Sequence, residues 1–537
     1  MRQLFALLLL SASIQSISAQ SWAWAQGEGG PGSDAANSVT IDEQGNSYIT
    51  GYIAGFADFS GANYQGRGIY DVCIAKYNPQ GGLVWVKLAG GDNNESGNAI
   101  NYKNGYLYLT GYFNDTTWFD GNRMISRGGS DAFIAKYDKD GNFIWVKQAG
   151  GANGDIGMSI DVDDVGNIFV AGTFRTSMSL DAIIISSPNL YDESFYAKYD
   201  ANGNVVWAKA TRGNNSNQIA GVAFDNDHSF FITGFFGGSF SVDNRTVNSS
   251  TSSYDIFLAK IDTDGNLDWL KKAGSSNEDA AHGVCSDLNG NPSIVGYFSG
   301  LAYFDGHSVN YSDYSDVFVA QYDSAGNNLW VRAGIGHQQD LGWGIANDSN
   351  GNIFATGMFR DNINFDGNII NAVDDRDIFL ISYSPNGDVR WLQQAGGQGI
   401  ETGFSIAVAN SGLVAVCGYY SHTCFFGSIP VDYATVTEMF IAEFNQPVVN
   451  RIVDLKEDSN ISIYPNPSSG NYNLQISNYE FRQPLAVHIS DLTGREILLQ
   501  QIGSSAAEIK LSAFESGVYF LKLEGRGLLL TRRIVKD

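Results

Sequence analysis

Short apolar runs, rich in β-branched and aromatic side chains, recur along most of the chain. Glycine, asparagine and aspartate bound these runs, and this alternation predicts β-strands joined by tight turns. In one representative stretch, strands are predicted at Ser159 to Asp163, Asn167 to Phe174, Glu193 to Tyr199 and Asn204 to Lys209. The variable segment between the second and third strands is predicted to form an extra hairpin at the rim of the sheet.

The turns within this stretch share one formula. Asp163 and Asp200 each stand three residues before a glycine, Gly166 and Gly203. The aspartate side chain can accept a bond from the backbone two residues on, and the glycine takes the left-handed conformation of a bulged hairpin. Each stretch therefore predicts two hairpins, which give four strands.

Three kinds of residue repeat in step with this four-strand pattern. Tryptophans recur every 60 to 62 residues, at Trp24, Trp85, Trp145, Trp207, Trp269, Trp330 and Trp391. Glycines keep the same period, at Gly51, Gly111, Gly172, Gly234, Gly296, Gly357 and Gly418. Acidic residues precede each third strand, at Asp71, Asp131, Glu193, Asp255, Asp316, Asp377 and Glu438. Three series with one period indicate seven copies of one structural unit.

The strands are apolar on both faces, so each sheet must be covered on both sides, as neighbouring blades of a β-propeller are. The fourth strand occurs six times after its own first three strands and once before them all, at Ser21 to Ala25. An opening strand that completes the last sheet leaves no bare edge. We therefore predict an all-β protein whose residues 20–445 form a seven-bladed β-propeller closed by the N-terminal strand, rather than an open β-solenoid or tandem sandwiches.

Segments such as Gly166 to Gly172 and Asp131 to Tyr137 resemble the bacterial SBBP-type β-propeller repeats. The likeness extends over residues 21 to about 445. It implies the propeller fold and carries no common activity, because this family has none to transfer.

The repeat stops at Asn445, and residues 446–460 are predicted to be a polar linker. Seven short strands are then predicted within residues 461–537, which suits a small immunoglobulin-like β-sandwich. In the last 87 residues ten basic and ten acidic side chains balance, so the propeller carries the net charge of −25.

This tail resembles the type A C-terminal sorting domain of the bacterial type IX secretion system. The residues that carry the likeness are Tyr464, Pro465, Asn466, Pro467, Gly470, Asp491, Gly494, Ser516, Gly517, Val518, Tyr519, Arg532, Arg533 and Lys536. The resemblance implies the type IX machinery as a partner, removal of the tail, and release of the protein or its attachment to surface lipopolysaccharide. The alternative is an ordinary adhesive sandwich domain.

Composition narrows the setting of the protein. With 57 acidic and 32 basic residues, the surface would repel nucleic acid and anionic membranes. Arg2, the apolar run Leu4 to Leu10 and the small-residue site at Ala19 predict a signal peptide at residues 1–19. Later apolar runs are too short to span a bilayer. The expected location is therefore secreted or on the outer cell surface.

The chain has four cysteines, too few for a disulfide framework in a chain of this length. Cys73 and Cys285 fall in different repeats at different strand positions, so we do not expect them to pair. Cys417 and Cys424 flank what the sequence indicates to be a turn, and a bond between them is left open.

A further repeated position lies just before each first strand, and six of its seven residues are acidic: Asp34, Glu95, Asp155, Asn217, Asp279, Asp340 and Glu401. First strands line the centre of a propeller, so we predict these residues at one mouth of the channel. There they either bind a cation or a polar ligand, or act as latches that cap backbone N–H groups. Departures from the repeat nearby, at His282, His337, Trp343 and Phe404, point to a ligand face.

No catalytic motif occurs in the chain, and we expect a binding protein without enzymatic activity, whose ligand is a glycan, a peptide or a protein. The alternatives are a polysaccharide hydrolase or lyase that uses the mouth carboxylates, and a purely structural surface protein. No cofactor is expected. The Asp-rich turns, such as Asp138 to Asn142, resemble calcium loops superficially. Turn chemistry without a metal is the favoured interpretation, and calcium binding is the alternative.

Overall fold

The computed structural model describes residues 21–225, 229–251, 253–446, 461–476, 485–491, 496–525 and 528–537. The chain divides into two compact units, Met1–Val448 and Val449–Asp537. The predicted signal peptide, and the predicted linker from residue 447 onward, lie outside the described residues. None of the described residues forms a helix that could cross a membrane.

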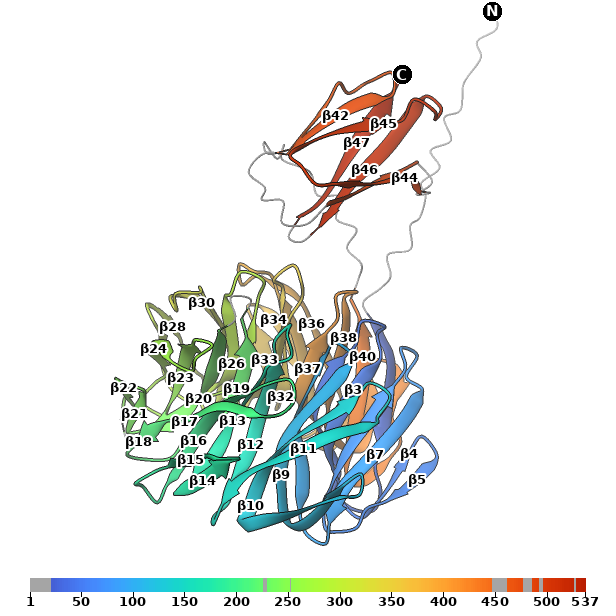
Figure 1. Ribbon diagram of the computed structural model, residues 1–537. Coiled ribbons are helices and arrows are strands. Elements are labelled where there is room, and N and C mark those ends of the chain that lie inside the picture. Colours follow the sequence, from blue (N-terminus) through green and yellow to red (C-terminus); the bar gives the residue numbers. More distant parts are fainter. Residues whose placement is uncertain are drawn as a thin grey trace, which may run out of the picture. The chain divides into compact units, whose positions relative to one another are not determined.

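The described strands of the first unit pair into seven antiparallel four-stranded sheets, seen as successive twisted layers in Figure 1. Sheet 1 has β2 (Ala35–Ile41), β3 (Ser47–Ile53), β6 (Asp71–Tyr77) and β7 (Leu83–Gly91). Sheet 2 has β8 (Glu95–Lys103), β9 (Tyr106–Phe119), β10 (Asn122–Asp138) and β11 (Phe143–Gly151). Sheet 3 has β12 (Ile156–Val162), β13 (Ile168–Arg175), β16 (Asp192–Tyr199) and β17 (Val205–Ala210).

The remaining sheets follow the same order. Sheet 4 has β19 (Asn217–Phe224), β20 (Phe230–Gly237), β23 (Tyr254–Ile261) and β24 (Leu267–Ala273). Sheet 5 has β25 (Ala280–Ser286), β26 (Pro292–Phe298), β29 (Asp316–Tyr322) and β30 (Asn328–Gly336). Sheet 6 has β31 (Leu341–Asn347), β32 (Ile353–Phe359), β35 (Asp377–Tyr383) and β36 (Val389–Gln398). Sheet 7 has β37 (Thr402–Val408), β38 (Leu413–Phe426), β40 (Ala434–Asn445) and β1 (Ser21–Glu28).

The predicted extra hairpins are present between the second and third strands of the sheets. They comprise β4 (Phe56–Phe59) with β5 (Ala62–Gln65), β14 (Ser177–Leu180) with β15 (Ile183–Ser186), β21 (Ser239–Val242) with β22 (Arg245–Asn248), β27 (Ala302–Phe304) with β28 (His307–Val309), β33 (Asn362–Phe365) with β34 (Asn368–Asn371), the end of β9 with the start of β10, and the end of β38 with β39 (Ile429–Pro430). Several pair with the fourth strand of the preceding sheet: β14 with β11, β33 with β30, β38 with β36, and β21 with the short β18 (Arg212–Gly213). The hairpins thus tie each sheet to its neighbour.

The repeated glycine is explained by a close approach of two backbones. A β-bulge in each first strand brings it against the second strand. A Cβ atom at Gly51 would lie 1.9 Å from the carbonyl oxygen of Ala35, and one at Gly418 would lie 1.8 Å from that of Thr402. Only glycine fits such a contact.

The repeated tryptophan packs across the contact between two neighbouring sheets. We call each such contact a seam and name it by the numbers of its two sheets, so that seam 1/2 joins sheet 1 to sheet 2. Trp85 of sheet 1 covers Gly141 in the last turn of sheet 2, where an added Cβ would lie 3.1 Å from the indole. The same contact joins Trp24 of β1 to Gly81 of sheet 1, at 2.6 Å. Strand β2 also lies against β37 and β38. Sheets 1 and 7 are therefore neighbours.

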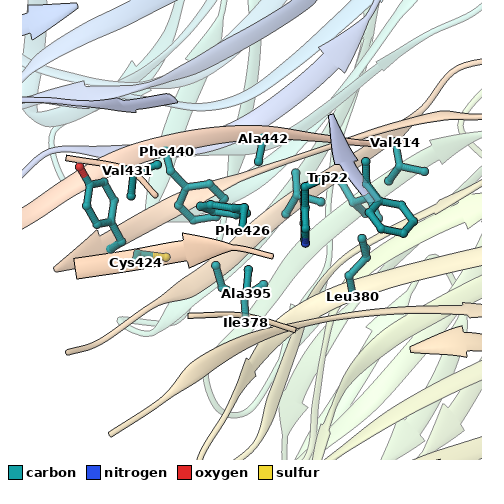
Figure 2. Close-up of a cluster of buried hydrophobic side chains, with 14 of the residues drawn as sticks. Trp22, Ile378, Leu380, Ala395, Val414, Cys424, Phe426, Val431, Phe440 and Ala442 are labelled. Atoms are coloured by element: carbon teal, nitrogen blue, oxygen red, sulfur yellow. The ribbon is translucent and has the colours of Figure 1, made fainter. Parts of the chain in front are cut away.

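The pairing of β1 with β40 confirms the predicted partner of the N-terminal strand. Trp22 is 7% exposed and meets Phe426 and Phe444 edge-on, with ring centroids 4.9 and 5.4 Å apart. Figure 2 shows Trp22 within the apolar cluster formed with Phe426 and Phe440. Burial of a residue of this size fixes the strand firmly.

The second unit contains all seven strands predicted for it. One sheet holds β41 (Ile461–Tyr464), β42 (Asn471–Ile476) and β45 (Ala506–Lys510), and the other holds β44 (Glu496–Ile502), β43 (Leu485–Ser490), β46 (Gly517–Gly525) and β47 (Leu528–Lys536). Leu474, Val487 and Leu521 share one buried cluster, so the two sheets pack face to face.

All four cysteines are buried and free. The bond that we left open between Cys417 and Cys424 is absent because both residues lie in one continuous strand, β38, rather than on either side of a turn. Seven residues of extended chain place their Cα atoms much farther apart than a disulfide allows.

Candidate functional site

The six acidic residues predicted at the channel mouth are fully buried. Asp34, Glu95, Asp155, Asp279, Asp340 and Glu401 have 0% exposed surface, and Asn217 has 1%. Their predicted placement is therefore corrected: they lie inside the seams rather than on an open mouth.

Each of the six carboxylates accepts backbone N–H groups. Asp34 accepts from Gly30 at 2.8 Å and Ala54 at 2.7 Å. The other five carboxylates accept in the same way. The Gly91 N–H donates to Glu95, the N–H groups of Gly151 and Arg175 donate to Asp155, those of Ser275 and Ser299 donate to Asp279, that of Arg360 donates to Asp340, and that of Gly397 donates to Glu401. These are the contacts expected if the residues act as latches that cap backbone N–H groups. We call this repeated position the latch position and its six carboxylates the latch carboxylates.

The same residues also join neighbouring sheets through their backbones. The Glu95 N–H donates to the Tyr70 carbonyl of sheet 1 at 2.9 Å, and the Asp34 N–H donates to the Thr437 carbonyl of sheet 7 at the same distance. Asp155, Asp279, Asp340 and Glu401 repeat this bond. The backbone of this repeated position therefore bonds the two sheets at each of these seams.

Each latch carboxylate faces an acidic residue of the preceding sheet. Burial raises the pKa of Asp34 to about 7 and that of Asp340 to about 8, and the nearby carboxylates of Glu438 and Asp316 add to these shifts. Burial and then Asp377 raise the pKa of Glu401 to about 8. Glu401 Oε1 and Asp377 Oδ1 are buried and have no hydrogen-bond partner among the described residues.

A second repeated position, three residues after the latch, behaves differently. It is the bulged residue of each first strand and carries Asn37, Asn98, Met158, Ala220, His282, Trp343 and Phe404. All seven are partly exposed. A bulge redirects its side chain out of the ladder. The residue type changes from sheet to sheet, which the buried latch position does not allow.

Three of these residues, in sheets 5 to 7, join aromatic neighbours in a continuous row. The ring centroids are 5.6 Å apart for Tyr297 and His282, 4.0 Å for His282 and Trp343, 5.5 Å for Trp343 and Phe404, and 5.3 Å for Phe404 and Tyr419. We call these five residues the aromatic row.

Two polar groups accompany the aromatic row. His282 and Trp343 are stacked, and the Nδ1 atom of His282 lies 2.8 Å from the Gly342 carbonyl. Burial lowers the pKa of His282 to about 4, so the imidazole is neutral at pH 7 and donates through Nδ1. At the other end, the Arg376 guanidinium lies 5.6 Å from the Tyr419 ring and donates to its hydroxyl. The row thus offers aromatic surface with a cation at one end.

In sheets 1, 2 and 5 the bulged residue bonds the equivalent carbonyl of the next sheet, as His282 bonds Gly342. Asn37 donates to the Gly97 carbonyl at 3.0 Å, and Asn98 donates to that of Gly157 at 2.9 Å. Trp343 makes no such bond, and its buried Nε1 atom has no partner among the described residues. The departures at His282, Trp343 and Phe404, noted in the sequence, therefore come together in space.

His337, the fourth departure, lies apart from this row. Its side chain is 69% exposed and stands 4.0 Å from Asp313. Sequence analysis missed Tyr297 and Tyr419, which directly follow the repeated glycine of their sheets. That position holds an aromatic residue in five of seven repeats, a signal that was available.

The Asp-rich turns hold their carboxylates within the turn itself. Asp138 accepts from the Asp140 and Asn142 N–H groups at 2.9 and 2.8 Å, and from the Asn142 side chain at 2.7 Å. In the described ranges, no three His, Cys, Asp or Glu side chains are grouped so as to hold a metal ion.

In the second unit, the predicted sorting residues anchor the last strand. Asn466 Oδ1 accepts from the Val535 N–H at 2.8 Å, the Gly470 carbonyl accepts from Leu511 at 2.6 Å, and Gly517 pairs with Lys536. Tyr519 is 7% exposed and donates to the Glu515 carbonyl at 2.6 Å. Asn466 and Pro467 are exposed and Asp491 is half-buried, whereas Gly494 lies outside the described residues.

Two known families match the chain. The secretion system C-terminal sorting domain matches residues 462–537, and the β-propeller repeat family named SBBP matches residues 26–60 and 144–173. Both families are those that the sequence motifs indicated.

Curated relatives are longer than this chain, which spans about a quarter of their length. An uncharacterized WD repeat-containing protein of Acanthamoeba polyphaga mimivirus is 25% identical over 57% of this chain and 27% of its own. The regulatory protein FlaEY of Caulobacter vibrioides is 22% identical over 43% of this chain and 26% of its own.

Two solved structures show weak overall similarity to this chain. The Neurospora crassa Pan2 WD40 domain has 9% identity and a TM-score of 0.38, covering 76% of this chain and 89% of that one. Sqt1 of Chaetomium thermophilum has 8% identity and a TM-score of 0.31, covering 80% of this chain and all of that one.

Proposed function

Since the chain is an SBBP β-propeller repeat protein with a secretion system C-terminal sorting domain, we propose that it is a binding module that acts outside the cell through the aromatic row. The sorting domain indicates export by type IX secretion and a secreted or cell-surface location. The exposed Asn466 and Pro467 belong to the surface that the export machinery would meet.

The propeller that presents this row is proposed to be a closed ring of seven blades. Seam 7/1 supports closure because it repeats the contacts of the other seams, with Trp24 over Gly81 and the Val39 N–H donating to Ser405 Oγ at 3.2 Å. The second unit is proposed to be an immunoglobulin-like sandwich, as its three-stranded and four-stranded sheets around one core suggest. After export the tail would be removed and the propeller released or attached to surface lipopolysaccharide.

One observation carries the binding proposal: the departures from the repeat at the bulged position are adjacent and aromatic. A residue that serves the repeated structure recurs in every repeat, whereas a single binding site breaks the symmetry. Aromatic faces with one cation and a few hydrogen-bond donors suit a glycan, a peptide or a protein loop.

The alternative hydrolase or lyase would use the latch carboxylates, and their environment disfavours this. Glycosidases need two carboxyl groups about 5 to 10 Å apart in contact with the substrate. Here Glu401 and Asp377 have no exposed surface and cannot contact a substrate. We therefore propose that the protein is not an enzyme and that these acids hold the seams.

The proposal is tested on the full chain with printed glycan and peptide arrays. Trp343→Asn installs the residue type found at this position in sheets 1 and 2. We expect the array signals of the native protein to fall at least tenfold in this variant, with the melting temperature almost unchanged.

Met158→Asn is the matched control, because Met158 occupies the same bulged position in sheet 3, away from the row. Its array signals should equal those of the native protein. Signals that survive in Trp343→Asn, or a native protein that binds neither array, would overturn the proposal.

A further inference from the structure

Equivalent grooves lie on the rim of the propeller unit. Each is formed where the extra hairpins of two neighbouring sheets meet the fourth strand of the sheet that comes earlier in the chain. Three of them have volumes of about 630 Å³ at seam 6/7, 570 Å³ at seam 5/6 and 250 Å³ at seam 1/2. The three grooves are lined by corresponding parts of the repeat, namely the hairpins and the fourth strand.

At four seams an ion pair spans this rim. A cation two residues after the repeated tryptophan meets an aspartate in the hairpin turn of the next sheet. The pairs are Lys87 with Asp120 at 3.9 Å, Lys209 with Asp243 at 3.3 Å, Lys271 with Asp305 at 2.8 Å and Arg332 with Asp366 at 3.4 Å. Residues of these pairs line the grooves at seams 1/2 and 5/6.

Seam 6/7 has lost both members of the pair. Gln393 stands in the cation's position and Gly427 in that of the aspartate. No charged side chain lines the groove there, although the chain as a whole carries a net charge of −25. At seam 7/1, which also lacks the pair, the Glu28 carboxylate bonds Ser60 in the same hairpin turn.

The aromatic residue beside the groove is also uncovered at seam 6/7. Phe425 pairs with Gly396 and is 43% exposed. Its counterpart at seam 1/2 is Trp118, which pairs with Gly90 and is covered by the Arg67 guanidinium 5.0 Å from its ring. The counterpart of Arg67 at seam 6/7 is Val373, which carries no charge.

We propose that the rim groove at seam 6/7 is a binding site for a neutral oligosaccharide. The exposed Phe425 ring offers a face for the C–H surface of a sugar. The amides of Gln398 and Asn371 and the hydroxyl of Thr423 border the groove and provide donors and acceptors for sugar hydroxyls. The Gln394 side chain donates to the Asn371 carbonyl and to Asp377, so it offers the ligand only its amide oxygen. An uncharged lining disfavours charged polymers, because it offers their ions no partner when they lose water.

The site is separate from the aromatic row and does not depend on it. It is tested on the full chain with maltohexaose, cellohexaose, laminarihexaose and mannohexaose, with oligogalacturonate as the charged probe. Binding is measured by calorimetry and by saturation-transfer NMR. We expect at least one neutral probe to bind and oligogalacturonate not to bind.

Phe425→Ala should weaken that binding about tenfold, since it removes the stacking face. Gln393→Lys combined with Gly427→Asp should abolish it by rebuilding the ion pair of the other seams. Aspartate suits the turn, because Asp120, Asp243, Asp305 and Asp366 have φ between 41° and 50° and Gly427 has φ of 62°. The melting temperature of this variant must also be measured, because a Cβ at residue 427 would lie 3.2 Å from Trp22.

Arg332→Gln combined with Asp366→Gly is the matched control, since it opens the rim at seam 5/6, where Asn364 stands in place of Phe425. This control and Trp343→Asn should bind the neutral probe as the native protein does. The proposal is overturned if no neutral probe binds at millimolar concentration, if oligogalacturonate binds equally well, or if Phe425→Ala retains full affinity.

Discussion

Seam 7/1 and seam 1/2 are built alike although the chain reaches them differently. Seam 1/2 joins consecutive segments, whereas seam 7/1 joins the two ends of the first unit. The Asp34 N–H donates to Thr437 as the Glu95 N–H donates to Tyr70, each at 2.9 Å. Val39 donates to Ser405 Oγ at 3.2 Å as Ile100 donates to Ser38 Oγ at 3.1 Å.

The two seams differ in their buried titratable side chains. At seam 1/2, Lys76 in the third strand donates to the Lys139 carbonyl at 3.1 Å. Seam 7/1 has Glu443 at that position, which accepts from Trp24 Nε1 at 2.9 Å and from Ser47 at 2.7 Å. Glu28 adds bonds to Ser60 and Tyr77. At seam 7/1, where no direct chain connection joins the two sheets, buried carboxylates therefore bond β1 to both sheet 7 and sheet 1.

The largest effect should come from removing β1. Deletion of residues 21–28 leaves β40 with a bare edge and exposes the cluster around Phe426. We expect a fall in melting temperature on the order of 15 °C or more, or loss of cooperative unfolding. A deletion that leaves the calorimetric transition unchanged would contradict closure by this strand.

Trp24→Ala and Trp85→Ala compare the two seams directly. Both indoles cover a glycine of the next sheet, so each substitution should cost about 3 to 5 kcal/mol of unfolding free energy. Chemical denaturation measures both. A cost below about 1 kcal/mol for Trp24→Ala alone would mean that seam 7/1 is not formed in solution.

Stability should fall as pH rises. Burial raises the pKa of Glu28 and Glu443 to about 7, and those of the latch carboxylates to between about 6 and 8. The folded state therefore holds protons that the unfolded state has already released, and their stabilising contribution is complete below about pH 4 and disappears as pH rises through 6 to 8. We expect the melting temperature to fall on the order of 5 °C between pH 5 and pH 9. A rise over this interval would show that the carboxylates are ionised in the folded protein.

The smallest effect should come from Glu443→Gln, which keeps the shape of the side chain but turns one acceptor into a donor facing Trp24 or Ser47. We expect a loss of about 1 to 2 kcal/mol, and a shallower pH dependence than in the native protein. Glu43→Gln is the control, because Glu43 accepts one exposed hydrogen bond, from the Tyr102 hydroxyl, among the residues that the structure describes. Equal effects of the two substitutions would mean that Glu443 makes no special contribution.

The sequence predicted the strands well because each repeated residue performs one local task. The glycine before Tyr52 or Tyr419 permits the close approach of two strands, and the aspartates such as Asp138 close their own turns. These tasks depend on neighbours within one repeat, so the pattern alone is sufficient to find them.

Features that depend on distant contacts were harder to predict. The repeated acids before the first strands are polar, and nothing in the pattern showed that the neighbouring sheet would bury Asp340 completely. The aromatic row combines side chains from three repeats, which come together only when the sheets stand side by side. The sequence indicates a turn between Cys417 and Cys424, although β38 continues through both residues.

Closure of the ring is tested most directly by hydrogen–deuterium exchange of the amides in β1. In a closed ring, the Trp24 to Gly27 amides should exchange as slowly as those of β7 and β11, which occupy the same place in their sheets. Exchange of β1 at the rate of an unstructured peptide, while β7 stays protected, would contradict the account.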